Sequence, residues 1–364
     1  MKKFLVLTIF LFVCSAVGFS QQAPGIPDKS LDSFACIEIL HEGRVKPLDS
    51  FARAKLLEWS ARSSYKKESA VHFLARLFFD PDSTMTNELF RVNNPEVIYA
   101  LGLSEAKSHR YSLDTLRPAL QQLQNLARTS SEIEEKKRGP VDREALRLFE
   151  NVNSYLELLS AFRFAIPRED FAVNSAQLRK DLGLPQDRSS FSYIEIREVL
   201  PLIQKKLGRF SPDRSLENLS PDETALFAVS KSLMLYSEYY RPFVLPILPM
   251  TNGTRLQWES PWKLLTSPSA KTEYQALGSQ IANLAALGSA WQAGDAKTFE
   301  SKAKQFGESA AVQIRAGGLS PKPGLEIAYN RLDPFYLAKI FYAFALIGVF
   351  LSLVVAGKIL RPLS

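Results

Sequence analysis

The feature that most constrains this chain is an uncharged apolar run near its C-terminus. Ile340 to Gly357 is a stretch of 18 residues without a charge, which as a helix is about 27 Å long at roughly 1.5 Å per residue. That length approaches the ~30 Å hydrocarbon core of a bilayer, so the run predicts a transmembrane helix over 340–357. A buried core helix is the alternative, but a core helix of this length usually contains polar positions.

The charges beside this run predict its orientation. Lys358 and Arg361 follow it directly, and basic residues favour the cytoplasmic side of a span. The sequence therefore predicts a cytoplasmic tail over 358–364. The expected location is a bacterial inner (cytoplasmic) membrane, crossed once, with the main domain outside the cytoplasm in the periplasm.

The N-terminus predicts export independently. Two lysines precede an apolar run over 4–13, and small residues follow it, which is the pattern of a secretory signal peptide over 1–20. Cleavage is expected after Ser20. An uncleaved anchor is one alternative, and lipidation of Cys14 is another.

Charge and cysteine content exclude several classes of partner and site. Outside the signal peptide and the tail, 41 basic residues face 38 acidic ones without a long basic cluster, so no nucleic-acid partner is expected. Cys36 is the only cysteine beyond the signal peptide, which excludes an intrachain disulfide and a Cys-x-x-Cys redox pair. The sequence also lacks the Cys-x-x-Cys-His pattern that attaches haem covalently.

Helical periodicity dominates the body of the chain. Apolar residues from Ala145 to Phe162 share one helical face, and Ser220-Pro-Asp-Glu223 is a helix start signal. The expected fold is mainly α: a multi-helix extracytoplasmic domain with a small N-terminal β-hairpin and one C-terminal transmembrane helix. The expected divisions are a flexible leader (21–33), an N-terminal helical subdomain (34–166), a C-terminal helical subdomain (167–324) and a juxtamembrane segment (325–339).

The densest motif runs from His41 to Arg53. In its structural interpretation, Gly43 turns a hairpin, Pro47 ends the second strand, and Asp49 caps a helix that begins at Ser50. In its functional interpretation, basic side chains converge on a carboxylate or propionate. These side chains are Arg44, Lys46 and Arg53. Spacing alone favours the structural interpretation.

This motif also carries a resemblance to a known family. His-Glu-Gly-Arg-Val-Lys-Pro-Leu-Asp-Ser-Phe-Ala-Arg (41–53) resembles a motif that opens the large extracytoplasmic domain of some long system II cytochrome c maturation proteins, of the ResC/CcsA haem-handling type. Three later stretches occur in the same order as in that domain, and the resemblance covers most of 35–357. They are the Pro-rich segment leading to Trp258, Trp-Gln-Ala-Gly-Asp (291–295), and Glu-Ile-Ala-Tyr-Asn-Arg-Leu-Asp-Pro-Phe (326–335) directly before the span.

The chain departs from the family pattern in its membrane part. Family members continue through many helices, with a tryptophan-rich loop and haem-ligating histidines, whereas this chain has one predicted span. None of those haem residues is carried over. The resemblance implies either an extracytoplasmic subunit of a separate multi-span protein or a remnant of a longer protein.

The subunit interpretation implies a membrane-tethered assembly factor for c-type cytochromes. It would be a docking scaffold for a multi-span system II haem-handling protein, with apocytochrome c as a further partner. No cofactor is expected to bind directly, and haem would be reached through the partner. The resemblance implies partner or haem-propionate contacts from His41, Gly43, Arg44, Lys46, Pro47, Asp49 and Arg53. It implies juxtamembrane docking by Tyr329, Asn330, Pro334 and Phe335.

Two further functional classes remain. One is a single-span envelope binding or scaffold protein unrelated to haem, which nothing in the composition excludes. The other is an enzyme, but His41, His72 and His109 lie on separate segments without metal-ligand spacing. No nucleophile or phosphate-binding motif accompanies them. The sequence therefore predicts neither an enzyme nor a metal site, and it favours a hydrogen-bonded turn role for His41 over axial haem ligation.

Overall fold

The computed structural model describes residues 25–208, 219–240, 245–252, 255–267 and 271–360. The predicted signal peptide (1–20), Cys14 and the tail end (361–364) lie outside the described residues. The chain divides into two compact units, Met1–Ser320 and Pro321–Ser364. The expected helical subdomains, 34–166 and 167–324, correspond mostly to the first unit.

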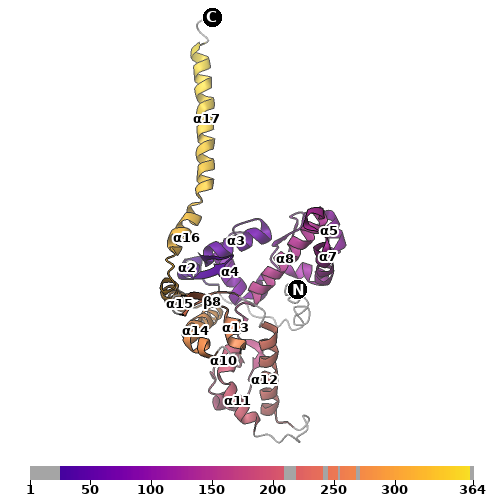
Figure 1. Cartoon of the computed structure of the whole chain (residues 1–364), viewed down its shortest axis with the longest axis vertical. Helices are drawn as coiled ribbons and strands as arrows, with labels where there is room; N and C mark the ends of the chain where they lie inside the picture. Colours follow the sequence, from indigo (N-terminus) through magenta and orange to yellow (C-terminus); the bar gives the residue numbers. More distant parts are fainter. Residues whose placement is uncertain (1–24, 209–218, 241–244, 253–254, 268–270, 361–364) are drawn as a thin grey trace. The chain divides into compact units, whose positions relative to one another are not determined.

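The first unit is mainly helical, as the sequence predicts, with short strand pairs (Figure 1). Its α-helices are α2 (Asp32–Cys36), α3 (Leu48–Ser60), α4 (Ala70–Phe79), α5 (Pro95–Ala100), α6 (Leu113–Leu116), α7 (Leu120–Glu132), α8 (Pro140–Ser160), α9 (Ala176–Leu182), α10 (Tyr193–Glu198), α11 (Leu200–Leu207), α12 (Pro221–Tyr240), α13 (Pro261–Thr266), α14 (Lys271–Ala293) and α15 (Ala296–Ala316).

Strands pair only with their neighbours along the chain, in two-stranded antiparallel sheets. The pairs are β1 (Glu38–His41) with β2 (Arg44–Pro47), β3 (Phe90–Arg91) with β4 (Arg110–Tyr111), β5 (Arg168–Ala172) with β6 (Ser190–Phe191), and β7 (Leu248–Asn252) with β8 (Arg255–Glu259). The described strands are therefore local additions to a helical body.

The predicted N-terminal hairpin is confirmed. His41 pairs with Arg44 across a two-residue turn, and both turn residues have positive φ, 53° at Glu42 and 76° at Gly43. Positive φ at both positions is the turn geometry whose twist matches antiparallel strands, and glycine adopts it without a steric cost.

Two local predictions need correction. The helix after the hairpin begins at Leu48 instead of Ser50, and Pro47 stands at its N-cap without a side-chain bond. Asp49 lies in the first turn, where an acid suits the helix dipole. The segment 21–33, expected to be flexible, is ordered over its described part. A short 3₁₀ helix, η1 (Asp28–Leu31), precedes α2, and Ile26 and Leu31 are each 1% exposed, so apolar burial orders this segment.

Aromatic side chains join the beginning and end of the first unit. Phe79 on α4 lies 6.0 Å from Phe34 on α2 and 5.7 Å from Phe299 on α15, between ring centroids. Trp291 on α14 lies 6.1 Å from Phe79. Because all four rings are buried, this cluster fixes the early helices against the α14–α15 pair.

A second aromatic cluster surrounds Trp262 on α13. Its indole stacks on Tyr240 with centroids 4.7 Å apart, and its Nε1–H donates to the Ser160 carbonyl at 2.9 Å. Trp262 is only 1% exposed. A buried indole with a satisfied N–H is typical of a core anchor, so Trp262 does not form a ligand-stacking ledge.

The helices with the strongest sequence signals are confirmed. The apolar stripe from Ala145 lies on α8 and is buried. Ser220 and Glu223 form the expected reciprocal cap, with Ser220 N–H donating to Glu223 Oε2 at 2.6 Å. The helical pair α14–α15 turns at Gly294, whose φ is 65°, and Asp295 accepts from Thr298 N–H at 3.0 Å.

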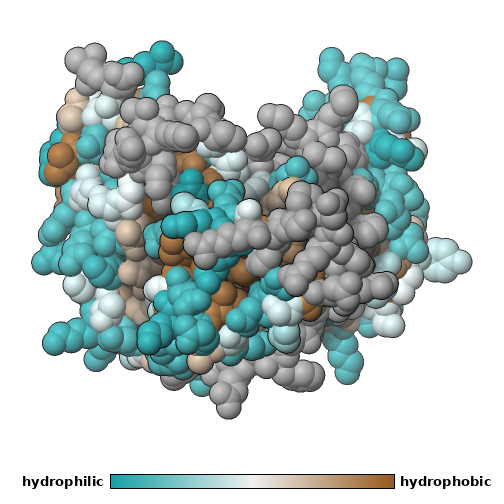
Figure 2. Space-filling model, turned by 90° about the horizontal axis from the view of Figure 1, so that it is seen from below, coloured by the Kyte–Doolittle hydropathy of each residue, from teal (hydrophilic) through white to brown (hydrophobic). Residues whose placement is uncertain are grey.

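The second unit contains α16 (Pro323–Leu332) and α17 (Pro334–Leu360). The stretch Pro323–Leu353 is long and apolar enough to cross a membrane, and its most apolar window is not buried within the chain. This agrees with the predicted span over 340–357. By contrast, hydrophilic side chains cover most of the described surface in the view from below, with smaller apolar areas between them (Figure 2).

Candidate functional site

The motif residues occupy the hairpin and the first turns of α3. Lys46 Nζ lies 3.1 Å from His41 Nδ1 and 3.6 Å from a Glu42 carboxylate oxygen. The His41 ring also packs edge-on against Phe51, with centroids 5.0 Å apart. His41, Glu42 and Lys46 therefore meet at the turn end of the hairpin.

The His41 imidazole favours its neutral form. Burial is the main cause that lowers its pKa, and the nearby Lys55 and Lys46 ammonium groups lower it further. The Lys46 ammonium can only donate, so the unprotonated Nδ1 of a neutral ring accepts a hydrogen bond from it. This agrees with a hydrogen-bonded turn histidine.

Of the remaining motif side chains, Arg53 pairs within α3, and Arg44 lies at the exposed hairpin end. Arg53 Nε donates to Asp49 at 2.9 Å along α3, and the Asp49 side chain is buried. Arg44 is exposed at the hairpin end. Lys46 and Arg53 thus have acceptors within the chain, and Arg44 is the most accessible of the three basic side chains that were expected to converge.

Glu38 on β1 is a buried acid that the motif analysis did not single out. It is 5% exposed, and its Oε1 has no hydrogen-bond partner in the described part of the chain. Burial raises its pKa to about 7, and the positive charge of Arg315 opposes this rise. A carboxyl group in this position is protonated in mildly acidic solution.

Elements that contain or directly adjoin three of the four resembling stretches contact one another in the first unit. Leu40 N–H on β1 donates to the carbonyl of Pro246, in the Pro-rich segment, at 3.1 Å. Helix α15 contacts both β1 and β7, and its N-cap Asp295 ends the third stretch. The fourth stretch forms α16 and the start of α17.

The juxtamembrane residues lie on two helices of the second unit. Tyr329 and Asn330 are on α16, whereas Pro334 and Phe335 begin α17. Tyr329 is 54% exposed and Phe335 is 72% exposed. Large exposed rings beside an apolar helix are typical of residues at a membrane interface.

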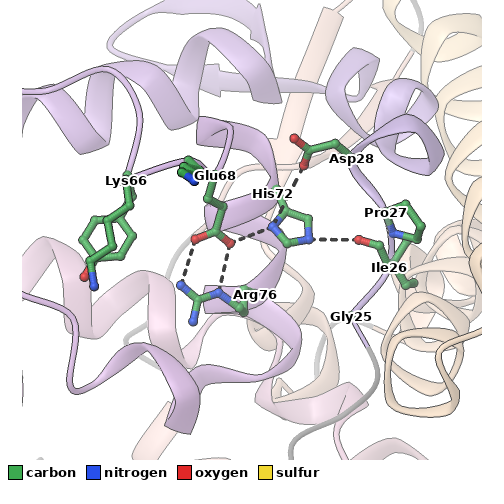
Figure 3. A pocket seen from close by; sticks show the side chains of 10 residues that line it. Gly25, Ile26, Pro27, Asp28, Lys66, Glu68, His72 and Arg76 are labelled. Carbon is green, nitrogen blue, oxygen red and sulfur yellow. Dashed lines mark hydrogen bonds and ion pairs between the residues drawn. The ribbon is translucent and has the colours of Figure 1, made fainter.

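A cleft of about 600 Å³ lies beside the start of the described chain. It is lined by the segment 25–28, the turn 65–68, and two basic side chains of α4, His72 and Arg76 (Figure 3). The turn places Lys66 with φ 53°, and the Lys66 ammonium lies 5.3 Å from the Tyr65 ring.

Glu68 is the centre of the charged groups in this cleft. Its carboxylate accepts from Arg76 Nε at 3.0 Å and Nη2 at 2.9 Å, a two-point pairing that suits the guanidinium fork. It also accepts from His72 Nδ1 at 2.7 Å. These hydrogen bonds are the main causes that hold the Glu68 pKa below its usual value, against the opposing effect of burial.

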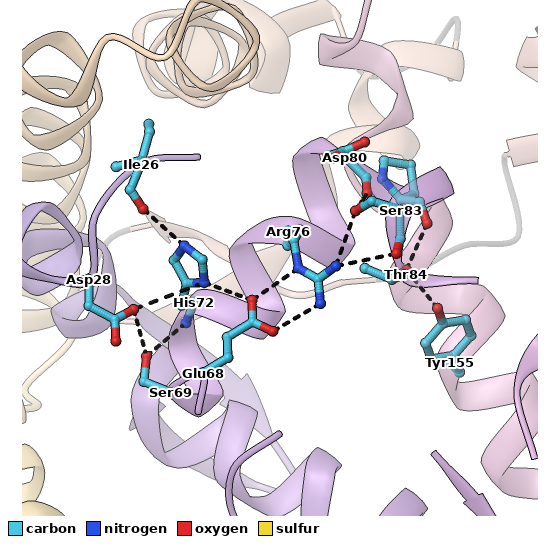
Figure 4. Close-up of polar contacts among 11 residues, drawn as sticks. Ile26, Asp28, Glu68, Ser69, His72, Arg76, Asp80, Ser83, Thr84 and Tyr155 are labelled. Carbon is cyan, nitrogen blue, oxygen red and sulfur yellow. Dashed lines mark hydrogen bonds and ion pairs between the residues drawn. The ribbon is translucent and has the colours of Figure 1, made fainter. Parts of the chain in front are cut away.

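His72 faces an acceptor at each ring nitrogen. Nδ1 points to Glu68, and Nε2 lies 2.9 Å from the Ile26 carbonyl oxygen (Figure 4). Both nitrogens must carry hydrogen to satisfy both acceptors, so the geometry requires the imidazolium form. The Glu68 hydrogen bond is the largest cause that raises the His72 pKa, and burial opposes it. The charged ring ties the start of the described chain to α4.

The polar contacts continue from Arg76 toward the loop after α4. Arg76 Nη1 donates to the Ser83 carbonyl at 3.2 Å. Thr84, next in the chain, shares a 2.6 Å hydrogen bond with the buried Tyr155 hydroxyl on α8 (Figure 4). The cluster therefore positions α4 against both η1 and α8.

Sequence reasoning missed this cluster, although part of its signal was present. Glu68, His72 and Arg76 follow one another at intervals of four, the spacing of one helical face. The Ile26 carbonyl comes from 46 residues earlier, and no local pattern indicates it. Among the described residues, no group of three or more His, Cys, Asp or Glu is arranged to hold a metal ion.

The chain has no match among known protein families, and a search of curated proteins finds no significant match. The family resemblance therefore depends on the four stretches described above.

Proposed function

We propose that this chain is a membrane-tethered, extracytoplasmic assembly factor for c-type cytochrome maturation. It acts as a docking scaffold for a multi-span haem-handling membrane protein and has no enzymatic activity of its own. In this proposal α17 is a single span of the bacterial inner membrane, the first unit lies in the periplasm, and the partner holds the haem.

The observation that carries the proposal is the meeting of the resembling stretches. The hairpin and the Pro-rich segment both adjoin α15, and the last stretch leads directly into the apolar helix α17. A rigid platform of this kind can position a haem or an apocytochrome for thioether formation, because positioning alone lowers the barrier to a reaction between two partners.

Arg44 is the side chain best placed for a partner contact. It is exposed at the hairpin end, whereas the side chains of Lys46 and Arg53 are only 12% and 30% exposed. A guanidinium pairs with a carboxylate or propionate at two points. We therefore assign the partner contact first to Arg44, with Lys46 supporting the turn that presents it.

The test is an affinity purification of the full chain from its native membrane in detergent, with absorbance recorded through the Soret region. The expected result is a Soret band together with a multi-span, tryptophan-rich protein. Arg44→Glu should weaken this co-purification, whereas Arg128→Glu, which changes an exposed arginine on α7, should not. A colourless eluate without such a protein would overturn the proposal.

One observation favours a second candidate, a single-span envelope scaffold unrelated to haem. Two of the three basic side chains of the motif have acceptors within the chain, as in a purely structural hairpin. In that case the purified chain would lack a Soret band, and Arg44→Glu would leave its partners unchanged.

A further inference from the structure

Helix α16 displays an exposed apolar face close to the apolar helix α17. Leu325, Tyr329 and Leu332 follow one another at i, i+4 and i+7, so they share one side of the helix. Their exposed fractions are 66%, 54% and 63%. Single exposed apolar residues are ordinary, but three large ones on one face mark a surface for a partner or a membrane.

The other sides of α16 differ in character. Ile327 lies on the opposite side and is 5% exposed. Glu326, Asn330 and Arg331 lie between these two sides when placed at 100° per residue. A short helix with one exposed apolar face and polar flanks is the pattern of a helix that lies in a membrane interface.

A single residue fixes α16 to α17. Asp333 ends α16 with φ 42° and ψ 66°, and its N–H donates to the Tyr329 carbonyl at 3.2 Å. Its carboxylate Oδ1 then accepts from Tyr336 N–H at 3.2 Å, which caps α17, and Pro334 occupies the first helical position. Because Asp333 makes hydrogen bonds to the end of α16 and to the start of α17, it fixes the junction between the two helices.

The length of chain between Asp333 and the uncharged run determines the depth of α16 in the membrane. The residues 334–339 separate Asp333 from the uncharged run, about 9 Å of helix at roughly 1.5 Å per residue. Each headgroup layer of a bilayer is roughly 5–8 Å thick. With α17 inserted, α16 therefore ends near the outer edge of the headgroup layer. Tyr329, Phe335 and Tyr336 suit the preference of aromatic rings for this layer.

We propose that α16 is an interfacial helix whose Leu325, Tyr329 and Leu332 face inserts into the headgroup layer. The occupant of this face is the lipid bilayer itself, because the face continues directly from the predicted span. The inference rests on the proposed membrane tether. It adds a second contact with the membrane, which fixes the direction in which the chain leaves its span.

Tryptophan substitution tests this proposal in the full chain, reconstituted in phosphatidylcholine vesicles that carry bromine at shallow or deep acyl positions. Tyr329→Trp places a probe on the apolar face, and Asn330→Trp places a matched probe one residue away on the polar flank. Three native tryptophans, Trp59, Trp262 and Trp291, are at most 2% exposed. Trp258 is half-buried, and the signal of the unsubstituted chain is subtracted.

The expected result is a blue-shifted emission and strong quenching of the Tyr329→Trp probe by shallow bromine, with weaker quenching by deep bromine and little for Asn330→Trp. Equal quenching of both probes, or none, would overturn the interfacial helix. Carbonate extraction separates this outcome from a failure of the tether. A chain that resists extraction but shows no difference between the probes retains its span, whereas a chain released by carbonate contradicts the proposed tether and with it the interfacial helix.

Discussion

Ionisable side chains favour opposite charge states in the hairpin region (38–47) and in the cleft region (25–28 and 65–76). Glu38 and His41, on the hairpin, both favour their neutral forms, because burial raises the pKa of the acid and lowers that of the imidazole. Glu68 and His72, at the cleft, favour their charged forms, because each binds the other. The same residue types therefore acquire opposite charge states from their partners.

This difference separates two structural roles. Burying an ionised carboxyl group without an ion-pair partner lowers the stability of the fold, and protonation of the group removes this penalty. A carboxylate that accepts hydrogen bonds from both a guanidinium and an imidazolium links the segments that carry these groups. The cleft region thus holds η1 to α4 by charge, whereas the hairpin region depends on packing and turn geometry. Substitutions at five positions test this contrast.

The largest expected effect is at Glu68. Glu68→Gln removes the carboxylate charge that accepts hydrogen bonds from both Arg76 and His72. Removing one partner of a fully buried ion pair costs about 3–5 kcal/mol of unfolding free energy. Because these side chains are 15–20% exposed, the expected cost here is about 2–4 kcal/mol. Urea unfolding of the full chain in detergent, followed by tryptophan fluorescence, measures it. The control Glu42→Gln changes an acid that is 77% exposed and should cost less than about 0.5 kcal/mol.

Glu38→Gln should act in the opposite direction. Above pH 7 the folded chain must ionise a buried carboxyl, so the amide should raise the unfolding free energy at pH 8 by about 1–3 kcal/mol, from roughly 1.4 kcal/mol per pKa unit. Since the Glu38 pKa is raised, its favourable contribution is complete below its unfolded pKa and is lost as pH rises through about 7. The stabilisation by the amide should therefore be smaller at pH 5. A destabilisation at pH 8 would contradict a buried, unpaired Glu38.

The two histidines should give pH dependences of opposite sign. The contribution of His72, whose pKa is raised, is complete below about pH 6.5 and is lost as pH rises through the folded value. The contribution of His41, whose pKa is lowered, is present above about pH 6.5 and is lost as pH falls through the folded value.

His72→Gln should therefore reduce the fall in stability on the alkaline side of pH 6.5, and His41→Gln should reduce the fall on the acidic side. Each change should be on the order of 1 kcal/mol. The measurement is the unfolding free energy of each variant minus that of the unsubstituted chain from pH 5 to pH 8.5. Parallel profiles for both variants would show that the two imidazoles do not differ in charge.

The smallest expected effect is at the hairpin turn. Gly43→Ala places a side chain at φ 76°, where no atom lies within 4 Å of the added carbon, so the cost is backbone strain alone. That strain is about 1 kcal/mol. Gly43→Asn should cost less, because asparagine tolerates this region. Equal losses for both variants would indicate a side-chain clash instead of strain.

Local structure was predictable where a short pattern is sufficient. The turn at Gly43 and the cap at Ser220 each depend on neighbours within a few residues, and both predictions are confirmed. The start of α3 was misplaced because Asp49 was interpreted as a cap. In the structure its side chain instead pairs with Arg53, one turn later on the same helix.

The cleft was not predictable in the same way. The four-residue spacing of Glu68, His72 and Arg76 is visible in the sequence, but the acceptor that completes the site is a backbone carbonyl. Every residue has a backbone carbonyl, so residue type does not show which carbonyl reaches His72. That depends on which segment the fold brings beside α4. Likewise, the sequence provides both Leu40 and Pro246 without indicating that they meet.

The packing of α2 against α15 has a consequence for how the chain is made. Ser33 N–H donates to Glu300 at 3.2 Å across 267 residues of sequence, and Phe34 lies 5.5 Å from Phe299. The earliest described helices therefore lack their partner until the ribosome has made α15, on the order of tens of seconds later at 5–20 residues per second. For the periplasmic location that we propose, this delay would favour export, because a chain with an incomplete core is still open enough to pass through a translocation channel.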